Sequence, residues 1–522
     1  MSQYEEKRDS LDVKKDISTL EYMAQDDPWA FNGKSEEWHA EYNKKLLRKI
    51  DFRMLPLLSY MFLVSYLDRS NLAQARLGNL QQDLGLHGTQ FNTATSILFV
   101  GYLLMQLPSN LLFTRVKPAI YLPTVMVIWG VISGCQAAAQ NFGGLLAVRF
   151  LLGFAEAPYF PGAVYMLSTW YTRAELSKRF AFFYAGPALA NMFGGLIAAG
   201  VLKDMDGYRG LAAWRWLFII EALMTVCVAV LAYFILPNFP HTTNWLCEEE
   251  RAYAQWRIAN DIGESSADED DSNKGLLHVA KLAVTDYRTW IFVLMQHCVL
   301  LSQTVTFFFP SVVNTLGYGN IETLLLTAPV WVATFLLNLL VMWSASRTNE
   351  RCFHLCASMA LTIAGNIMLI SIHLRGPRFL GMFFMAMGAQ PAFMIILTWV
   401  PNTFPRPLGK RAAITALVNM IGNTSNIYGS YLYPSSAAPQ YVFGGATIAG
   451  VGVVCMACAI TMRFILVREN KKLDKVEREG DFTLAPSLSV KERERRDLAR
   501  TGFRSEASWM FYGTIDQFIK KA

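Results

Sequence analysis

The sequence predicts an all-α polytopic membrane protein with 12 transmembrane helices in two six-helix bundles. Hydrophobic residues make up 53% of the 522 residues, charged residues make up only 17%, and the mean hydropathy is +0.25. A typical soluble chain carries about 25% charged residues. Twelve apolar stretches have roughly the length that crosses a bilayer as a helix, about 20 residues. A polar segment divides them into two sets of six, which is the layout of transporters built from repeats.

The predicted spans follow one another along the chain with short polar connections. The first set occupies residues 54–74, 91–113, 119–139, 143–170, 180–202 and 214–236. The second set occupies residues 290–315, 322–345, 352–373, 379–400, 411–432 and 441–467. The predicted domains are an N-terminal segment (1–53), an N-terminal bundle (54–236), a central loop (237–289), a C-terminal bundle (290–467) and a tail (468–522).

Basic residues in the short loops predict the orientation, because Lys and Arg are enriched on the cytoplasmic side of membrane proteins. With the N-terminus inside, the cytoplasmic loops carry Arg115, Lys117, Arg173, Lys178, Arg179, Arg347, Arg351, Arg406, Lys410 and Arg411. The opposite loops carry only Arg76, Lys203, Arg209, Arg375 and Arg378. Both termini and the central loop are therefore predicted to be cytoplasmic. The first 50 residues are polar and show no cleavable signal peptide, so the first span is expected to direct membrane insertion.

The polar segments outside the spans have few features of their own. Short helices are predicted near residues 36–50, at Trp245–Ile258 and at about 489–500. The acidic run Asp268–Asp271 lies in a Ser-rich stretch that is typical of a solvated linker. The aromatic segment Trp509–Tyr512 is consistent either with binding at the membrane surface or with disorder.

Several functional classes are not expected from this composition. The chain has no GxxxxGK[ST] phosphate loop, no HExxH motif and no clustered Cys and His residues, so neither an ATP motor nor a metal enzyme is predicted. We expect no cofactor and no enzymatic activity. The net charge of +6 is accounted for by cytoplasmic Lys and Arg, so a nucleic-acid partner is not expected.

Charged residues inside the predicted spans are the main functional signal, because a charge at the bilayer centre costs about 3 kcal/mol. The first apolar run, Met54 to Leu67, is 14 residues long. A helix of that length covers about 21 Å, less than a hydrocarbon core of about 30 Å. Asp68 and Arg69 are therefore predicted to lie inside the membrane, on faces that diverge by about 100°. The alternative is a helix that ends at Asp68 and leaves both charges in water.

The fourth span carries a second pair, Arg149 and Glu156, which are seven residues apart and share one helix face. Counted along the helix, Arg149 reaches a depth similar to that of Asp68 and Arg69. We predict one cavity with two acids and two arginines, in which ionised Glu156 engages Arg149 and one arginine can bind a substrate anion. The alternative is a permanent ion pair that locks two helices together. Pro158 predicts a bend or break directly after these charges.

Uncharged polar side chains form stripes on three other spans. Such stripes are not expected to face lipid, because the hydrocarbon core offers no hydrogen-bond partners. The second span has Thr95, Tyr102, Gln106 and Asn110. The eleventh has Thr415, Asn419, Asn423, Asn426 and Ser430, and the seventh has Gln296, His297, Gln303 and Thr304. These residues either line a cavity or hydrogen-bond neighbouring helices to one another. His297 is either a proton carrier or a neutral hydrogen-bonding group. Glu221 in the sixth span is expected to form a structural pair.

These motifs carry a resemblance that covers residues 51–467. Four sequence motifs resemble those of the major facilitator superfamily. They are Leu67-Asp-Arg-Ser-Asn-Leu72 in the first span, Arg149-Phe-Leu-Leu-Gly153 and Glu156-Ala-Pro-Tyr-Phe-Pro-Gly162 in the fourth, and Trp214-Arg-Trp-Leu-Phe-Ile-Ile-Glu221 in the sixth. Within it the chain is most similar to the anion:cation symporter branch and to fungal allantoate and nicotinate permeases.

The resemblance implies the major facilitator fold and a proton-coupled carrier of organic anions that rocks its two halves around a central site. It implies that Asp68 and Glu156 handle protons, and that Arg69 and Arg149 hold the substrate carboxylate together with Tyr102. From the polar stripes we add further expected substrate-binding residues: Gln106, His297, Gln303, Asn419 and Asn423.

The function predicted from the sequence is proton-coupled uptake of a small carboxylate, vitamin-like or allantoate-like, by a monomer in a fungal plasma membrane. The expected partners are the organic anion, the proton and the lipid bilayer. Two alternatives stay open: an exporter of an acidic secondary metabolite, and a nutrient sensor that does not transport.

Overall fold

The computed structural model describes residues 29, 31–113, 116–184, 186–243, 245–262, 276–404 and 408–479. Within these ranges every regular element is a helix, which confirms the all-α class. Eight helical stretches of this part are long and apolar enough to cross a membrane. The total of twelve spans stays a prediction. The acidic run Asp268–Asp271 and the predicted tail segments 489–500 and Trp509–Tyr512 lie outside the described residues.

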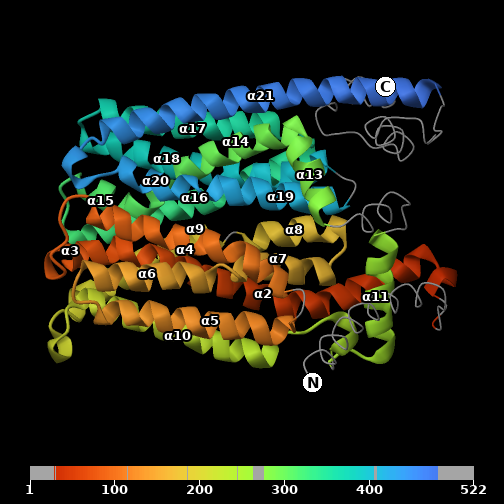
Figure 1. Cartoon of the computed structure of the whole chain (residues 1–522), viewed down its shortest axis with the longest axis horizontal. Helices are drawn as coiled ribbons and strands as arrows, with labels where there is room; N and C mark the ends of the chain where they lie inside the picture. The colour runs from red at the N-terminus through yellow and green to blue at the C-terminus, as the bar shows by residue number, and fades with distance from the viewer. Residues whose placement is uncertain are drawn as a thin grey trace. The chain divides into compact units, whose positions relative to one another are not determined.

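The chain divides into two compact units (Figure 1). The first unit takes its residues from Met1–Gly85, Ile97–Gly194 and Val201–Glu264. Its helices are α2 (Glu36–Ala75), α3 (Leu80–Asp83), most of α4 (Gln90–Phe113), α5 (Pro118–Cys135), α6 (Phe142–Glu156), α7 (Tyr159–Trp170), α8 (Arg173–Phe183), most of α9 (Gly186–Asp204), α10 (Ala213–Ile235) and α11 (Glu248–Ile262). The helix α11 confirms the helix predicted in the central loop.

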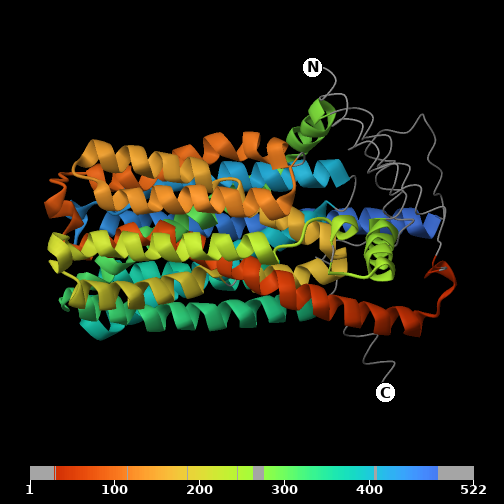
Figure 2. The ribbon, with the colours of Figure 1, turned by 90° about the horizontal axis from the view of Figure 1, so that it is seen from below.

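The second unit comprises Leu86–Ser96, Gly195–Gly200 and Ser265–Ala522. Its helices are α13 (Leu276–Thr285), α14 (Tyr287–Gln303), α15 (Phe309–Asn314), α16 (Asn320–Thr348), α17 (Cys352–Ser371), α18 (Arg375–Thr403), α19 (Leu408–Asn423), α20 (Ser425–Gly429) and α21 (Val442–Glu479). Within each unit the long helices run side by side (Figures 1 and 2). Such packing suits helices whose apolar side chains face one another as well as lipid.

The first long helix, α2, is continuous over 40 residues and joins two elements that the sequence predicts separately. The Ser35 side chain accepts a hydrogen bond from the Trp38 amide at 3.3 Å and caps its start. The helix contains both the predicted segment 36–50 and the predicted first span. It also continues past Asp68 to Ala75, so the alternative that it ends at Asp68 is wrong. Asp68 itself is completely buried.

The helix break predicted after the charges of the fourth span is confirmed. Helix α6 ends at Glu156 and α7 begins at Tyr159, with Pro158 as the residue before α7. Proline has no amide hydrogen to donate and its ring clashes with the preceding turn of a helix, so it interrupts the hydrogen-bond ladder here. The break places the Glu156 carboxyl at the C-terminal end of α6.

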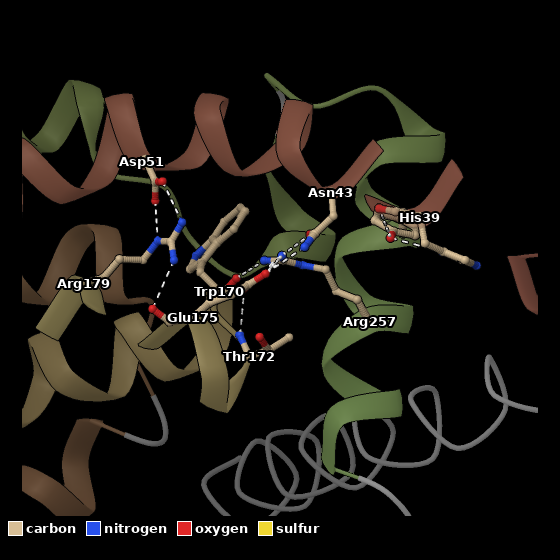
Figure 3. Close-up of polar contacts among 9 residues, drawn as sticks. His39, Asn43, Asp51, Trp170, Thr172, Glu175, Arg179 and Arg257 are labelled. Carbon is tan, nitrogen blue, oxygen red and sulfur yellow. Dashed lines mark hydrogen bonds and ion pairs between the residues drawn. The ribbon is translucent and has the colours of Figure 1, made fainter. Parts of the chain in front are cut away.

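A polar cluster joins α11 to the N-terminal part of α2 and to the start of α8 (Figure 3). The Arg257 guanidinium donates to the Asn43 side chain at 2.7 Å, and it contacts the two Glu175 oxygens at 3.1 and 3.2 Å. It also donates to the Trp170 carbonyl oxygen. Arg257 is buried, and a buried charge with this many partners fixes its neighbours. The cluster therefore holds part of the central loop on the first unit.

Ion pairs at corresponding places join the first and fifth helices of each set. In the first unit, Arg179 of α8 binds both Asp51 oxygens, at 2.6 and 2.7 Å. In the second unit, Asp286 caps α14 and lies 3.3 Å from the Lys410 ammonium of α19. Arg288 also binds both oxygens of Asp286, at 3.0 and 2.7 Å. Each of these pairs lies just before the predicted spans that it joins.

We expect replacement of Asp286 by asparagine to destabilise the protein in a pH-dependent way. Burial alone would raise the pKa of Asp286, but the hydrogen bonds and charges of Arg288 and Lys410 outweigh it and lower the pKa to about 2. The ionised carboxylate therefore stabilises the fold fully above about pH 4, by about 2 kcal/mol, and this contribution is lost as the pH falls through 2.

The measurement is thermal unfolding of the purified protein and of Asp286→Asn at neutral pH and near pH 3. The variant should unfold at a lower temperature at neutral pH, and the difference should shrink in acid. A difference of equal size at both pH values would contradict this assignment.

Candidate functional site

The centre of the candidate site is a buried ion pair between α2 and α6. The Nε of Arg69 donates to Oε1 of Glu156 at 2.7 Å, and the two side chains are 13% and 2% exposed. The Arg69 guanidinium also lies over the rings of Tyr66 and Tyr102, at 5.2 and 4.8 Å from their centroids. Two aromatic faces and one carboxylate thus hold the cation in place.

Arg149 lies two turns before Glu156 on α6 and is 1% exposed. It interacts electrostatically with Glu156, Arg69 and Asp68. The sequence predicts that ionised Glu156 engages Arg149, and the structure adds a direct ion pair between Glu156 and Arg69 of helix α2.

Tyr102 and Gln106 lie one turn apart on α4 and are both buried. The close contact of α4 with α6 explains how Tyr102 reaches the ion pair. A Cβ atom on Gly101 would be 2.2 Å from the Phe150 carbonyl oxygen, and one on Gly153 would be 1.9 Å from the Leu98 carbonyl oxygen. Only glycine permits this backbone approach, as in small-residue contacts between membrane helices. Oε1 of Gln106 has no hydrogen-bond partner among the described residues.

Asp68 points to a different part of the first unit from Arg69. Its carboxylate accepts hydrogen bonds from Ser133 Oγ at 2.8 Å, Thr225 Oγ1 at 2.9 Å and Trp129 Nε1 at 3.2 Å. These donors belong to α5 and α10, whereas Arg69 faces α6. The prediction that the two side chains serve different faces is confirmed. Asp68 thus has its own neutral donors, and it also interacts electrostatically with Glu156 and Arg149. The single cavity with two acids and two arginines stays a prediction.

The polar residues predicted on the seventh span contact other helices of the second unit. The Nε2 of His297 lies against the Tyr428 hydroxyl of α20, and its Nδ1 lies 3.4 Å from the Ile421 carbonyl oxygen. Gln303 at the end of α14 donates to the Ala389 carbonyl oxygen at 2.9 Å. Both side chains are partly buried. They hydrogen-bond helices together in this arrangement, and a role in substrate binding stays a prediction.

The asparagine stripe of the eleventh span bonds mainly to itself. The Asn423 amide donates to the Asn419 backbone and side-chain oxygens, at 2.8 and 3.2 Å. Asn426 continues the series with a 3.4 Å contact to Asn423. Asn419 and Asn423 are only partly buried, which leaves polar atoms at the surface of the unit. Their role as substrate-binding residues stays a prediction.

The neutral donors around Asp68 were not predicted from the sequence. Ser133, Trp129 and Thr225 are single polar positions in apolar spans. The spacing of two of them does indicate a shared helix face. Trp129 and Ser133 are four residues apart on α5, so both lie on one face. Spacing shows which residues share a face but not which helix that face meets.

Comparison with known protein families and structures places this arrangement in context. Residues 58–430 match the family model described as Major Facilitator Superfamily. The "MFS-type transporter cnsO" of Penicillium expansum is 33% identical over 457 residues, which cover 84% of this chain and 87% of that protein. The "Major facilitator-type transporter hxnP" of Emericella nidulans is 32% identical, and the match covers 83% of this chain and 88% of that protein.

Solved structures with the same fold are much more distant in sequence. The proton:xylose symporter XylE bound to 6-bromo-6-deoxy-D-glucose has a TM-score of 0.60 at 14% identity, covering 78% of this chain and 95% of that one. A bacterial homolog of the human lysosomal transporter Spinster, inward-facing and occupied, has a TM-score of 0.57 at 13% identity. That match covers 78% of this chain and 96% of the other. At such identities the likeness concerns the fold alone.

Proposed function

This chain belongs to the Major Facilitator Superfamily of membrane transporters, and from that premise we propose that it is a proton-coupled symporter of a small organic anion. The observation that supports the proposal is the buried Arg69–Glu156 ion pair with Arg149 nearby. Ionisable residues inside a membrane are expensive and generally mark a substrate, ion or proton path. Two arginines and a carboxyl group that interact inside the first unit support a site for a carboxylate and a proton.

The two arginines are the proposed anion-binding residues. Arginine binds carboxylates with two parallel hydrogen bonds, which adds geometric selectivity as well as energy. Arg69 donates to Glu156 through its Nε. The N–H groups on its two terminal nitrogens can then donate to the carboxylate of a substrate. Tyr102 and Gln106 complete this side of the proposed site. We further propose that His297, Gln303, Asn419 and Asn423 contact the remainder of the substrate.

Competition for arginine couples the proton to the anion in this proposal. While Glu156 is ionised, it engages Arg69 and opposes entry of a second negative charge. Once Glu156 takes up a proton, Arg69 can bind the carboxylate of the substrate. The two ligands therefore favour each other's binding, and the coupling is reciprocal because it is a free energy shared between sites. Asp68 is the second proposed proton-handling residue.

We propose a plasma-membrane location, monomeric transport and cytoplasmic termini. The orientation rests on the ten basic residues in the loops assigned to the cytoplasmic side, against five in the opposite loops. We propose alternating access as the transport cycle. We propose a carboxylate of vitamin or allantoate type as the substrate.

The test is uptake of a labelled carboxylate panel into yeast that express the protein at the cell surface. The panel contains nicotinate, allantoate, pantothenate, biotin and short dicarboxylates. At acidic external pH we expect one member to accumulate, and a protonophore should abolish its accumulation. No uptake of any member by a protein confirmed at the surface would contradict the proposal and favour the exporter or the sensor.

A further inference from the structure

A further buried acid, Glu221, lies in the first unit outside the arginine site. It belongs to α10 and is 0% exposed. Neither of its carboxylate oxygens accepts a hydrogen bond of normal geometry from a described residue. An ionised carboxylate is costly to bury unless a cation or hydrogen-bond donors compensate for the lost water. No described contact of Glu221 brings a cation to it. The sequence led us to expect a structural pair for Glu221, but none of its described contacts is an ion pair.

Glu221 faces the surroundings of Asp68. Thr225, one turn further along α10, donates to Asp68 at 2.9 Å and contacts the Glu221 carbonyl oxygen at 3.0 Å. The side chains of residues four apart lie on one helix face, so Glu221 and Thr225 both point to α2. Glu221 interacts electrostatically with Asp68, and the Asn71 side chain is its other polar neighbour. Asp68 and Asn71 are one turn apart on α2.

We propose that Asp68 and Glu221 form a carboxyl pair, outside the arginine site, that holds the transported proton inside the first helical set before the proton passes to Glu156. Two adjacent carboxyl groups in a low-dielectric interior cannot both be ionised at low cost, so the pair retains a proton. Three donors stabilise negative charge on Asp68, whereas Glu221 has none of that kind. One O–H bond forms when the proton enters and the same bond breaks when it leaves, so no co-reactant is needed.

A hydrogen-bonded series leads to this pair from one end of α5. Gln136 follows the last residue of α5 and is completely buried. Its amide donates to the Ser133 carbonyl oxygen at 3.2 Å and contacts the Ser133 hydroxyl at 3.4 Å. Ser133 in turn donates to Asp68. In the predicted orientation this end of α5 faces outside. The Gln136 amide relays no proton itself, but its contact with the Ser133 oxygen keeps the Ser133 hydroxyl hydrogen directed to Asp68.

The charged groups around the pair explain how its protonation would affect binding of the anion. Helix α5 presents only the neutral groups Trp129 and Ser133 to Asp68, and α10 presents Thr225 beside Glu221. From α6, Glu156 and Arg149 both interact electrostatically with Asp68. Protonation of the pair removes a negative charge that attracts Arg149. The proposal rests on the proposed function, since a proton without a coupled anion would have no transport role.

The experiment compares wild type and Glu221→Gln in vesicles, with labelled nicotinate or whichever carboxylate of the panel wild type accumulates. We expect the variant to lose protonophore-sensitive accumulation, with at least a tenfold lower final ratio. Exchange of internal for external substrate should stay within about twofold of wild type, because Glu221 lies outside the arginine site. Glu350→Gln is the matched control, since Glu350 is also a buried acid but is paired with Arg463 in the second unit. It should keep accumulation.

Two further measurements separate coupling from folding. Infrared difference spectra of the purified protein between acidic and alkaline pH should contain a protonated-carboxyl band that Glu221→Gln lacks. Glu221→Asp should restore coupling with an altered pH profile. Accumulation by Glu221→Gln with the wild-type pH profile would overturn the proposal, as would an unchanged infrared difference. If wild type itself shows no protonophore-sensitive accumulation, the proposed function fails, whereas the infrared result still tests the carboxyl pair.

Discussion

Replacement of Glu156 by glutamine is expected to abolish proton-driven accumulation while preserving substrate exchange. The Glu156 carboxylate accepts the hydrogen bond of Arg69 and is 2% exposed. Glutamine keeps the size and a carbonyl acceptor for that bond, but it cannot gain or lose a proton. One pH unit of gradient corresponds to about 1.4 kcal/mol, or about tenfold accumulation for one proton. The variant should lose that factor and equilibrate its substrate instead.

The measurement pairs accumulation with exchange in the same vesicles. Exchange shows that the variant is folded and binds substrate, so it serves as the internal control. Asp206→Asn is a matched control outside the spans, where the carboxylate accepts only the Ala213 amide at 3.0 Å among its described hydrogen bonds. It should transport as wild type does. Accumulation by Glu156→Gln that still follows external pH would eliminate Glu156 as a coupling residue.

Replacement of Arg69 by lysine is expected to raise the substrate KM strongly although the charge is kept. Lysine is a compact ammonium group and cannot make the paired hydrogen bonds of a guanidinium with a carboxylate. Loss of one hydrogen bond to a charged group costs about 1.5–3 kcal/mol, which corresponds to a tenfold to hundredfold weaker affinity. Lysine also loses the planar cation that lies over Tyr66 and Tyr102.

Initial rates of uptake over a range of substrate concentrations measure this effect. Arg209→Lys is the control, because Arg209 is an exposed loop residue whose guanidinium lies over the Tyr208 ring. Its KM should match wild type. A wild-type KM in Arg69→Lys would mean that Arg69 serves only as the ion-pair partner of Glu156.

Local features of the site could be predicted from the sequence because they depend on one helix at a time. The angular step of a helix separates Asp68 from Arg69, and the structure places them on different faces. Proline chemistry predicts the break after Glu156, and α6 ends there. In both cases the information lies in residues that are adjacent in the chain.

The contacts between helices could not be predicted in the same way. Periodicity gave Arg149 and Glu156 a common face. The ion pair between Arg69 and Glu156 depends instead on which helix packs against α6 and at what height. Similarly, the donors of Asp68 come from α5 and α10, whose registers relative to α2 no single-sequence pattern specifies. The position of Glu221 beside Asp68 follows from the same packing.

The most direct test of the central claim, that a proton and an organic anion share one transport cycle, uses the purified protein in sealed proteoliposomes. An imposed pH gradient, acidic outside and without a membrane potential, should drive labelled carboxylate above its external concentration, and a protonophore should return it to equality. The internal pH should fall as the anion enters. Uptake that only equilibrates the anion, with no change of internal pH, would contradict proton symport.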